Sequence, residues 1–443
     1  MKKILNHIIS SNNFLSLIGQ GIFALVGFGS LFLLTRSFSV EEFGVWILYL
    51  TAVTMVGMLR DGFLQTGLIR FISGVSKTYE KSYIGSSWVC GSVFTLTCIL
   101  VIMLISIIDP VFVENSHFKL FFMWSPLFFI LTMPYNYALS ILQARMMFGK
   151  IIILRLIHQL SFFSFIIYNF FTPQPIEYLI YAHLICSSIS SLYAITIGYS
   201  GVQYFFMYKK RQITELFNFG KYSAGTLLGT SLLKSSDIFI IGIFMGPAAA
   251  AFYSIPLKLI EMFEIILRSF VSVALPILSK ASIKGNIQKV EHTFYKYTGV
   301  LTIIYIPIVI ACFFLAEDFI IIFAGETYAH AAIIFRIFLI YALFLPIDRF
   351  TGVTLDSINQ PEANLIKVSF MVVANVLGDL LAIYLFNEVW AVAIVTITTV
   401  LIGVFLGIYF LNRTITLSCL KIIPIGTIEL KLLLTKFLFN QKT

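Results

Sequence analysis

Twelve apolar stretches, each about as long as a helix that crosses a bilayer, run through nearly the whole chain. About 20 apolar residues span the hydrocarbon core as a helix, and in lipid the backbone must satisfy its own hydrogen bonds. Runs of this length are far too long for barrel strands. The sequence therefore predicts an all-α polytopic membrane protein with about 12 transmembrane helices, at residues 14–35, 43–64, 84–108, 119–142, 151–171, 177–207, 219–245, 250–277, 297–316, 332–355, 364–386 and 389–411.

The stretches form two sets of six that correspond at an offset of 207 residues. LTRSFSVEEFGVW (34–46) occupies the place that IGIFMGPAAAAFY (241–253) occupies in the second half. A doubled set of helices is typical of carriers that open alternately to the two sides of a membrane. We therefore expect an N-terminal lobe at 1–208 and a C-terminal lobe at 209–411 around a central cavity. Residues 412–443 are expected to form a cytoplasmic, amphipathic tail or, alternatively, a weak thirteenth span.

Composition excludes a soluble protein and gives no sign of a metal or cofactor. The chain is 59% hydrophobic and only 12% charged, whereas soluble domains carry about twice that charged fraction. Its five cysteines lack paired spacing and its six histidines are scattered, so we expect no disulfide and no metal site. The run that begins at Phe14 has no small-residue cleavage site, and is interpreted as the first span rather than a signal peptide.

The distribution of positive charge predicts the orientation. When Arg155 and Lys367, which lie near span ends, are counted with the residues outside the spans, 21 lysines and arginines lie on the side of the N-terminus. Only Arg36 and Lys119 lie on the other side. The positive-inside rule then places both termini in the cytoplasm, and we expect a multi-pass protein of the bacterial inner membrane. The net charge of +9 reflects this topology and anionic lipid, so no nucleic-acid partner is expected. Short outer loops argue against a membrane enzyme.

Charged residues inside the spans are candidates for a functional site, because a charge in the apolar layer costs at least ~2.5–3.5 kcal/mol and normally faces a polar interior. Four of them fall within an arc of about 120° on the helix expected at 250–277. The alternative is that pairs such as Arg60–Asp61 and Asp348–Arg349 are structural. The candidate substrate-binding cations are Arg60, Lys234, Lys258, Arg268 and Arg349, and the candidate coupling or charge-balancing carboxylates are Asp61, Asp237, Glu261, Glu264, Asp348, Asp356 and Asp379.

Two of these carboxylates have informative positions. The offset of 207 places Asp61 opposite Arg268, so the two lobes are expected to bring opposite charges to corresponding depths. Asp379 lies one helical turn from Asn375 near the middle of its span, and it is either a helix-packing contact or a coupling-ion site. The charges within the spans are of both signs. A purely acidic interior would have favoured a cationic drug as substrate, and this one is mixed.

Two motifs resemble those of a known family. SSDIFIIGIFMGPAAAAFYSIPLKLIE (235–261) contains an Asp, an Ile-Gly step, a second Gly, a small-x-Tyr pattern and a basic residue, and the first half contains EEFGVW and GFLQTGLIRFIS (62–73). From about residue 8 to residue 411 the chain resembles the polysaccharide biosynthesis or O-antigen repeat-unit flippases of the multidrug/oligosaccharidyl-lipid/polysaccharide exporter superfamily. The resemblance implies a drug-exporter-like fold of two six-helix lobes.

The resemblance also implies a function. It implies movement of an undecaprenyl-diphosphate-linked oligosaccharide of an O-antigen or capsule from the inner to the outer leaflet, by alternating access, with H⁺ or Na⁺ as a coupling ion. The five cations would meet the diphosphate, because Lys and Arg bind phosphate oxygens through charge-assisted hydrogen bonds. A polysaccharide polymerase and a chain-length regulator are expected partners. No catalytic residue is expected.

Three alternatives remain. A multidrug or toxin exporter would share the fold, but residues 14–35 contain no acidic side chain for a cationic drug. A polysaccharide polymerase or glycosyltransferase is expected to carry a large outer loop with catalytic side chains. A scaffold or a lipid II-type flippase is the third alternative, and the latter type usually has two more spans.

Overall fold

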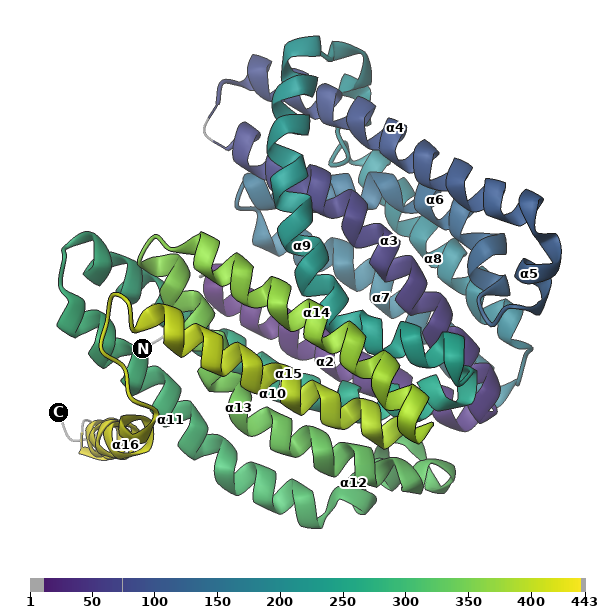
Figure 1. The fold of residues 1–443 in the computed structure, drawn as a ribbon. Helices are drawn as coiled ribbons and strands as arrows, with labels where there is room; N and C mark the ends of the chain where they lie inside the picture. The colour runs from purple at the N-terminus through teal and green to yellow at the C-terminus, as the bar shows by residue number, and fades with distance from the viewer. Residues whose placement is uncertain (1–11, 74, 440–443) are drawn as a thin grey trace. The chain divides into compact units, whose positions relative to one another are not determined.

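The protein is described here by a computed structural model that covers residues 12–73 and 75–439, without the side chains of residues 12–20, 59, 61–66, 219–228, 230, 419, 433–434 and 436–439. Every regular element in these ranges is a helix (Figure 1). The chain forms two compact units. The N-terminal unit contains Met1–Ser235 and Gly246–Ala251, and the C-terminal unit contains Ser236–Met245 and Phe252–Thr443. The division falls inside two helices, after Ser235 and after Ala251. The predicted lobe boundary after residue 208 stays a prediction.

The N-terminal unit is built from long helices joined by short turns, and α3 and α8 both pack against α6. Ser39 starts α3 with a capping box, in which its side chain and that of Glu42 each accept from the other's backbone, and this satisfies two donors at the helix end. The helices are α2 (Asn12–Ser37), α3 (Val40–Ile72), α4 (Lys77–Ile108), α5 (Pro110–Asn115), α6 (Lys119–Ala144), α7 (Phe148–Phe171), α8 (Ile176–Thr196), η1 (Val202–Met207) and most of α9 (Lys210–Phe244).

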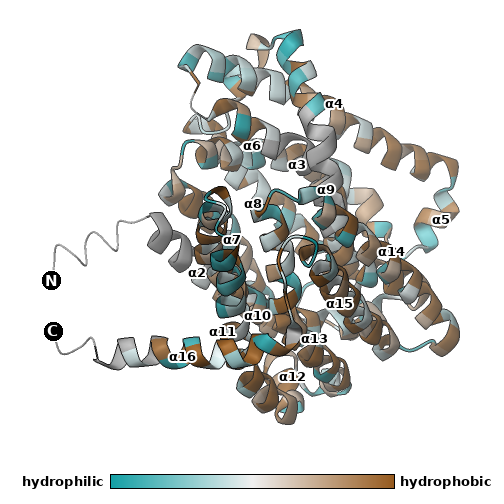
Figure 2. Ribbon diagram, turned by 60° about the vertical axis from the view of Figure 1, so that its left-hand side comes forward, coloured by the Kyte–Doolittle hydropathy of each residue, from teal (hydrophilic) through white to brown (hydrophobic). Residues whose placement is uncertain are grey.

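The C-terminal unit contains the rest of the chain, and its helix α15 packs against both α13 and α14. In Figure 2 these helices are hydrophobic over most of their length. Asn387 ends α14 in the left-handed conformation, which closes the last turn and lets α15 follow directly. The elements are α10 (Pro247–Ile283), α11 (Ile287–Phe314), α12 (Ala316–Ala324), η2 (Glu326–Ala331), α13 (Ala332–Ser357), α14 (Pro361–Phe386), α15 (Val389–Leu411), η3 (Cys419–Lys421) and α16 (Ile422–Phe439).

The helices confirm the predicted fold class. Ten of them are long and apolar enough to cross a membrane. The two remaining predicted spans, 14–35 and 219–245, fall on α2 and α9, whose side chains are only partly described. The described part of α2 is itself an apolar helix, Gly21–Ser37. Each of the twelve predicted spans therefore corresponds to one long helix, as expected for an all-α polytopic membrane protein.

The sixth span is shorter than predicted. The sequence predicts a helix over 177–207, but α8 ends at Thr196 and is followed by a turn and the short helix η1. Gly198 and Gly201 both have positive φ angles, of 76° and 67°, which glycine adopts without the steric penalty that a Cβ brings. The apolar residues that follow Thr196 therefore belong to the connection between α8 and α9.

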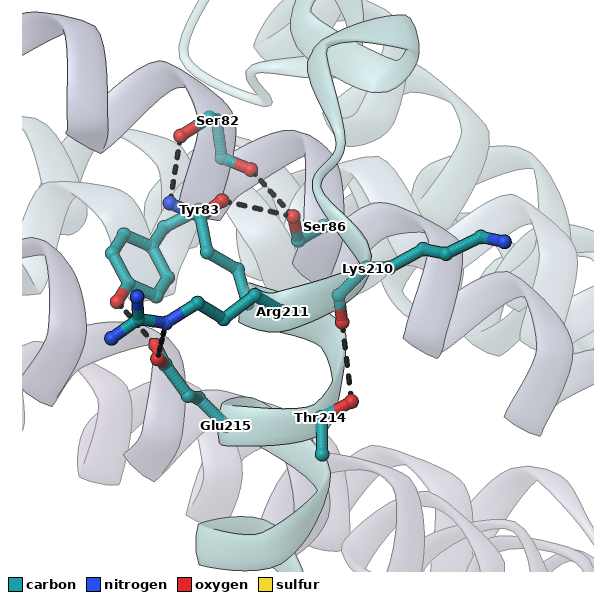
Figure 3. A network of polar contacts seen from close by, with 8 residues as sticks. Ser82, Tyr83, Ser86, Lys210, Arg211, Thr214 and Glu215 are labelled. Atoms are coloured by element: carbon teal, nitrogen blue, oxygen red, sulfur yellow. Dashed lines mark hydrogen bonds and ion pairs between the residues drawn. The ribbon is translucent and has the colours of Figure 1, made fainter.

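A polar network holds this connection to the start of α4 (Figure 3). The Tyr83 hydroxyl donates to Glu215 Oε2 over 2.7 Å, and Arg211 Nε donates to Glu215 Oε1 over 2.9 Å. Deeper in the unit, Gln212 Nε2 donates to Ser82 Oγ, and the backbone N–H of Lys209 donates to Ser86 Oγ. The first turns of α9 are therefore anchored to α4 within the N-terminal unit.

The tail forms a helix that packs against α11. Glu429 on α16 contacts Lys296 Nζ at 2.7 Å and His292 Nε2 at 3.1 Å. Gly299 and Gly426 meet where the two helices cross, and a Cβ on Gly299 would lie 2.7 Å from the Cα of Gly426. The choice between an amphipathic tail and a thirteenth span stays a prediction.

Candidate functional site

A buried polar cluster lies in the C-terminal unit, where the end of α9 meets α10, α14 and α15. α9 contributes Asp237, which is 4% exposed, and α14 contributes Asn375 and Asp379, which are 1% and 0% exposed. Asn375 and Asp379 are four residues apart, so they lie on the same face of α14. Asp237 belongs to the part of α9 that packs in this unit. Three polar side chains from two helices are thus enclosed within a span of apolar residues.

Asn375 joins the two carboxyl groups. Its Nδ2 donates to Asp237 Oδ1 over 2.5 Å and to Asp379 Oδ2 over 3.1 Å. Its Oδ1 accepts from the hydroxyl of Thr399 on α15 over 3.0 Å. Because Thr399 holds the amide oxygen, the NH₂ group is fixed toward the carboxylates.

Asp237 has further partners on α10 and α15. Tyr253 is fully buried, and its hydroxyl donates to Asp237 Oδ2. The hydroxyl of Thr396 also donates to Asp237 Oδ2, over 3.3 Å. Hydrogen-bond donors from three neighbouring helices, α10, α14 and α15, therefore surround this carboxylate.

Asp379 has a different environment. Its Oδ1 is buried and meets no hydrogen-bond donor among the described residues. The charged group that acts on it is Asp237, a second carboxylate rather than a cation. Two carboxylates that share a dry site cannot both keep a full negative charge without a counter-charge. The cluster can therefore bind a proton or a small cation between hard oxygen ligands.

The sequence predicted the acidic members of this cluster but not the rest. Asp237, Asp379 and the neighbouring Asn375 were recognised because they are polar residues inside predicted spans. Thr396 and Thr399 carry no such signal, because threonine in a membrane helix usually bonds to its own helix backbone. Tyr253 belongs to the small-x-Tyr motif, yet the motif does not indicate that its hydroxyl reaches Asp237.

The charged stripe on α10 is present and internally paired. Lys258 Nζ lies 2.7 Å from Glu261 Oε2, and both side chains are partly exposed. One turn further along, Arg268 lies 3.9 Å from Glu264. Each cation thus has an acidic neighbour on the same helix. The role of Lys258 and Arg268 in substrate binding stays a prediction.

The charges of α13 lie near the same region of the C-terminal unit. Tyr341, on α13, interacts electrostatically with Asp237, Glu264, Asp348 and Arg349. Asp348 forms an ion pair with the buried Lys367 rather than with the adjacent arginine, with Nζ and Oδ1 2.6 Å apart. At the end of the helix, Asp356 accepts from Asn364 and interacts with Arg349. Several predicted lumen residues therefore gather in one unit.

The remaining candidates belong to the N-terminal unit. Arg60 is 6% exposed and its guanidinium donates to the Phe129 carbonyl over 3.2 Å. Lys234 lies near the end of this unit's part of α9 and is exposed. The Asp61 side chain lies outside the described residues, so its predicted relation to Arg268 stays a prediction.

Comparisons with known proteins identify a family and a fold. Residues 33–333 match the family described as "Polysaccharide biosynthesis protein". No curated protein sequence matches the chain. The chain resembles the solved structure "Lipid II flippase MurJ, inward closed conformation", with a TM-score of 0.72 and 15% identity over 95% of this chain and 92% of that one.

Two further solved structures belong to multidrug transporters. An inward-facing MATE transporter of the MOP superfamily has a TM-score of 0.72 and 14% identity, over 88% of this chain and 95% of that one. An outward-facing MATE transporter of that superfamily has a TM-score of 0.62 and 13% identity, over 94% and 95%. At these identities the likeness shows the fold alone.

Proposed function

The chain belongs to the polysaccharide biosynthesis protein family, and from this premise we propose that it is a flippase for a lipid-linked oligosaccharide. The substrate is an undecaprenyl-diphosphate-linked repeat unit of an O-antigen or capsule, which moves from the inner to the outer leaflet. The observation that carries the proposal is the family match, which extends over residues 33–333.

The fold supports alternating access as the mechanism. Solved structures with this fold include transporters described as inward-facing and as outward-facing. Helices that contain prolines, such as α6 with Pro126 and Pro134, can bend because each proline removes a backbone hydrogen bond. The polyprenyl chain can stay in lipid while only the polar head group crosses.

The in-span cations fit the diphosphate chemically. Lys258, Arg268 and Arg349 are partly or fully exposed within the C-terminal unit, so their donors are accessible to phosphate oxygens. The acidic neighbours of Lys258 and Arg268 balance these charges when no substrate is bound. A mixed set of charges suits an anionic head group that must be released after it crosses.

The Asp237–Asp379 cluster is the proposed site of the coupling ion. Its two carboxylates, held by Asn375, can bind H⁺ or Na⁺. Among the described residues no cluster of three or more His, Cys, Asp or Glu side chains is present, so a singly charged ion suits this pair better than a polyvalent metal. Binding and release of the ion would alter the contact between α9 and α14.

A deletion strain tests the substrate. Without the protein, lipid-linked repeat units should accumulate on the cytoplasmic leaflet, and surface polysaccharide should be lost. Restoring the gene should reverse both effects. Normal surface polysaccharide together with raised sensitivity to drugs would contradict a flippase.

Such a result would favour the second candidate, a multidrug exporter. The observation in its favour is the TM-score of the MATE structure, which equals that of the flippase structure. The family match argues against a multidrug exporter, since the description of the family is "Polysaccharide biosynthesis protein".

Matched variants test the coupling site. Asp379→Asn and Asp237→Asn should abolish the dependence of transport on an imposed H⁺ or Na⁺ gradient while protein levels stay normal. Asp318→Asn, at an exposed position in the first turn of α12, is the control and should leave transport unchanged. Unaltered ion dependence in both cluster variants would remove this role from the pair.

A further inference from the structure

Two histidines within the N-terminal unit form a cluster that the proposed function does not use. His183, on α8, is 8% exposed and is enclosed by aromatic rings. It stacks on Phe128 with ring centroids 4.7 Å apart, and it meets Trp46 and Tyr49 edge-on at 5.6 and 6.1 Å. The His158 ring, on α7, lies 6.1 Å from it. Both helices are candidate membrane spans.

The hydrogen bonds fix the tautomer of His158. Ser187 lies between the two residues, and its hydroxyl donates its single proton to the His183 carbonyl over 2.7 Å. The 3.2 Å contact between Ser187 Oγ and His158 Nε2 must then be donated by the imidazole, because the serine has no second proton. In the neutral state His158 therefore carries its proton on Nε2, and Nδ1 is its basic nitrogen.

His183 keeps one nitrogen without a partner. Its Nδ1 is buried and has no hydrogen-bond partner among the described residues, and the same holds for the Tyr49 hydroxyl. Most buried polar atoms in proteins are hydrogen-bonded, so two such atoms on neighbouring rings are unusual. An intramembrane ionisable side chain of this kind is rare unless it has a function.

Among the described residues, no carboxylate acts electrostatically on either histidine. His158 is the titratable group that acts on His183 electrostatically. Tyr49 faces the pair from α3, and Tyr135 stacks on His158 from α6. Other titratable side chains on the packed helices include Arg155, which acts on Tyr135, and Cys186, which forms a hydrogen bond with Ser161. Charged side chains elsewhere on these helices include Arg36, Glu41, Glu42, Arg60, Lys150 and Glu177.

We propose that His158 and His183 form one proton-binding site in the N-terminal unit, separate from the Asp237–Asp379 cluster. The site takes one proton from the aqueous phase, because a second positive charge beside the first would be repelled. The faces of Phe128 and the neighbouring aromatic rings stabilise the imidazolium by cation–π attraction. Imidazole is the side chain whose charge changes near neutral pH.

Trp46 reports the protonation of this site, because an imidazolium beside an indole quenches its fluorescence. The full-length protein in lipid nanodiscs is titrated from about pH 8 to about pH 3, a range that extends below that of a free imidazole because burial disfavours the imidazolium. The same titration of Trp46→Phe is subtracted, which isolates the emission of Trp46 from the other three tryptophans of the chain. We expect a loss of Trp46 emission as the pH falls.

Variants test whether the loss of Trp46 emission arises from the histidine pair. His183→Gln should abolish this loss, and His158→Gln should shift the pH midpoint of the loss, because the neighbouring imidazole no longer shares the proton. His330→Gln, at an exposed position in η2, is the control and should leave the titration unchanged. An emission that does not respond to pH, or a response that is identical in both pair variants, would overturn the proposal. The difference between wild type and Trp46→Phe shows whether the emission of Trp46 responds to pH, even where a histidine variant does not fold. No transport is measured, so the result is independent of the proposed flippase activity.

Discussion

At the scale of single residues, burial rather than distance separates the ion pairs of this protein. Lys367–Asp348 and Lys258–Glu261 have almost equal separations, 2.6 and 2.7 Å. The Lys367 side chain is only 3% exposed and also donates to the Asp348 carbonyl, whereas both members of the α10 pair are more than a third exposed. Exposed pairs contribute little to stability, whereas breaking a buried pair leaves a charge without compensation.

This contrast predicts unequal effects of two similar substitutions. Lys367→Met should lower the free energy of unfolding by about 3–5 kcal/mol, since Asp348 would lose its ion-pair partner in a mostly buried site. Lys258→Met should change it by only about 0–1 kcal/mol. Denaturant-induced unfolding in detergent measures both. Adding Asp348→Leu to Lys367→Met should restore most of the loss, and equal losses in the two single variants would contradict the argument.

The same residues show how far the sequence could predict the site. A charge in an apolar span is visible in the sequence, so Asp237, Asp379 and Asp348 were found. Partners come from other helices, and nothing in the pattern around Thr396 indicates that it faces a carboxylate. Lys367 was counted among the inner charges, but it lies buried on α14. For its partner, Asp348, the sequence suggests a pair with the adjacent arginine only as an alternative, because sequence analysis sees neighbours along the chain only.

At the scale of elements, the crossing of α11 and α16 depends on two glycines. A Cβ built on Gly299 would lie 2.3 Å from the carbonyl oxygen of Ile422, which is backbone and cannot turn aside. Glycine thus lets the two helices approach closely, as small residues do between membrane helices. The sequence predicted a helix in the tail but not its docking, because a single glycine in each helix is not a recognisable motif.

We expect Gly299→Ala to separate α16 from α11. The added methyl group would push the backbones apart and make the 422–439 segment more accessible to proteases. Gly57→Ala is the matched control, since a Cβ on Gly57 meets nothing within 4 Å; there the change should be neutral or stabilising by roughly 0.5–1 kcal/mol. Limited proteolysis in detergent compares the two. Equal protection of the tail in both variants would show that the close approach is not required.

Acid should weaken the same contact. The hydrogen bond from Lys296, aided by the charges of Lys296 and His292, lowers the pKa of Glu429 below its ordinary value of 4.5. A group whose pKa is lower in the folded state stabilises the fold above its unfolded pKa and loses that contribution as the pH falls through the folded value. Melting temperatures of wild type and Glu429→Gln should therefore differ near pH ~7 and converge below pH ~4. A constant difference across this range would exclude Glu429 as the cause.

At the scale of the whole molecule, hydropathy alone predicted the architecture. Each of the twelve apolar stretches became one long helix, because length and apolarity decide whether a segment can span a bilayer. Only the ends differ. α9 begins nine residues before its predicted start, and α8 ends at Thr196. Glycine turn geometry and polar anchoring determine where these two helices begin and end. Hydropathy contains no information on either.

The orientation of the chain can be tested by cysteine labelling. Both termini and the connection before α9 are predicted to face the cytoplasm, because the basic residues concentrate there. Glu114→Cys, at an exposed position in α5, should react with a membrane-impermeant maleimide in intact cells. Lys210→Cys, exposed at the start of α9, should react only after permeabilisation. Wild type measures the background of native cysteines, and labelling of Lys210→Cys in intact cells would reverse the assignment.

The carboxylate pair of the C-terminal unit also has an electrical consequence. A singly charged ion that enters this site from one side of the membrane and leaves on the other crosses the membrane potential. That movement is worth about 2.3 kcal/mol per charge at 100 mV, which corresponds to a concentration ratio of roughly fiftyfold. Voltage alone could therefore drive the cycle when the ion concentrations on the two sides are equal. At equal ion concentrations, the proposed flipping would then stop when the membrane is depolarised, even while the sugar substrate remains abundant.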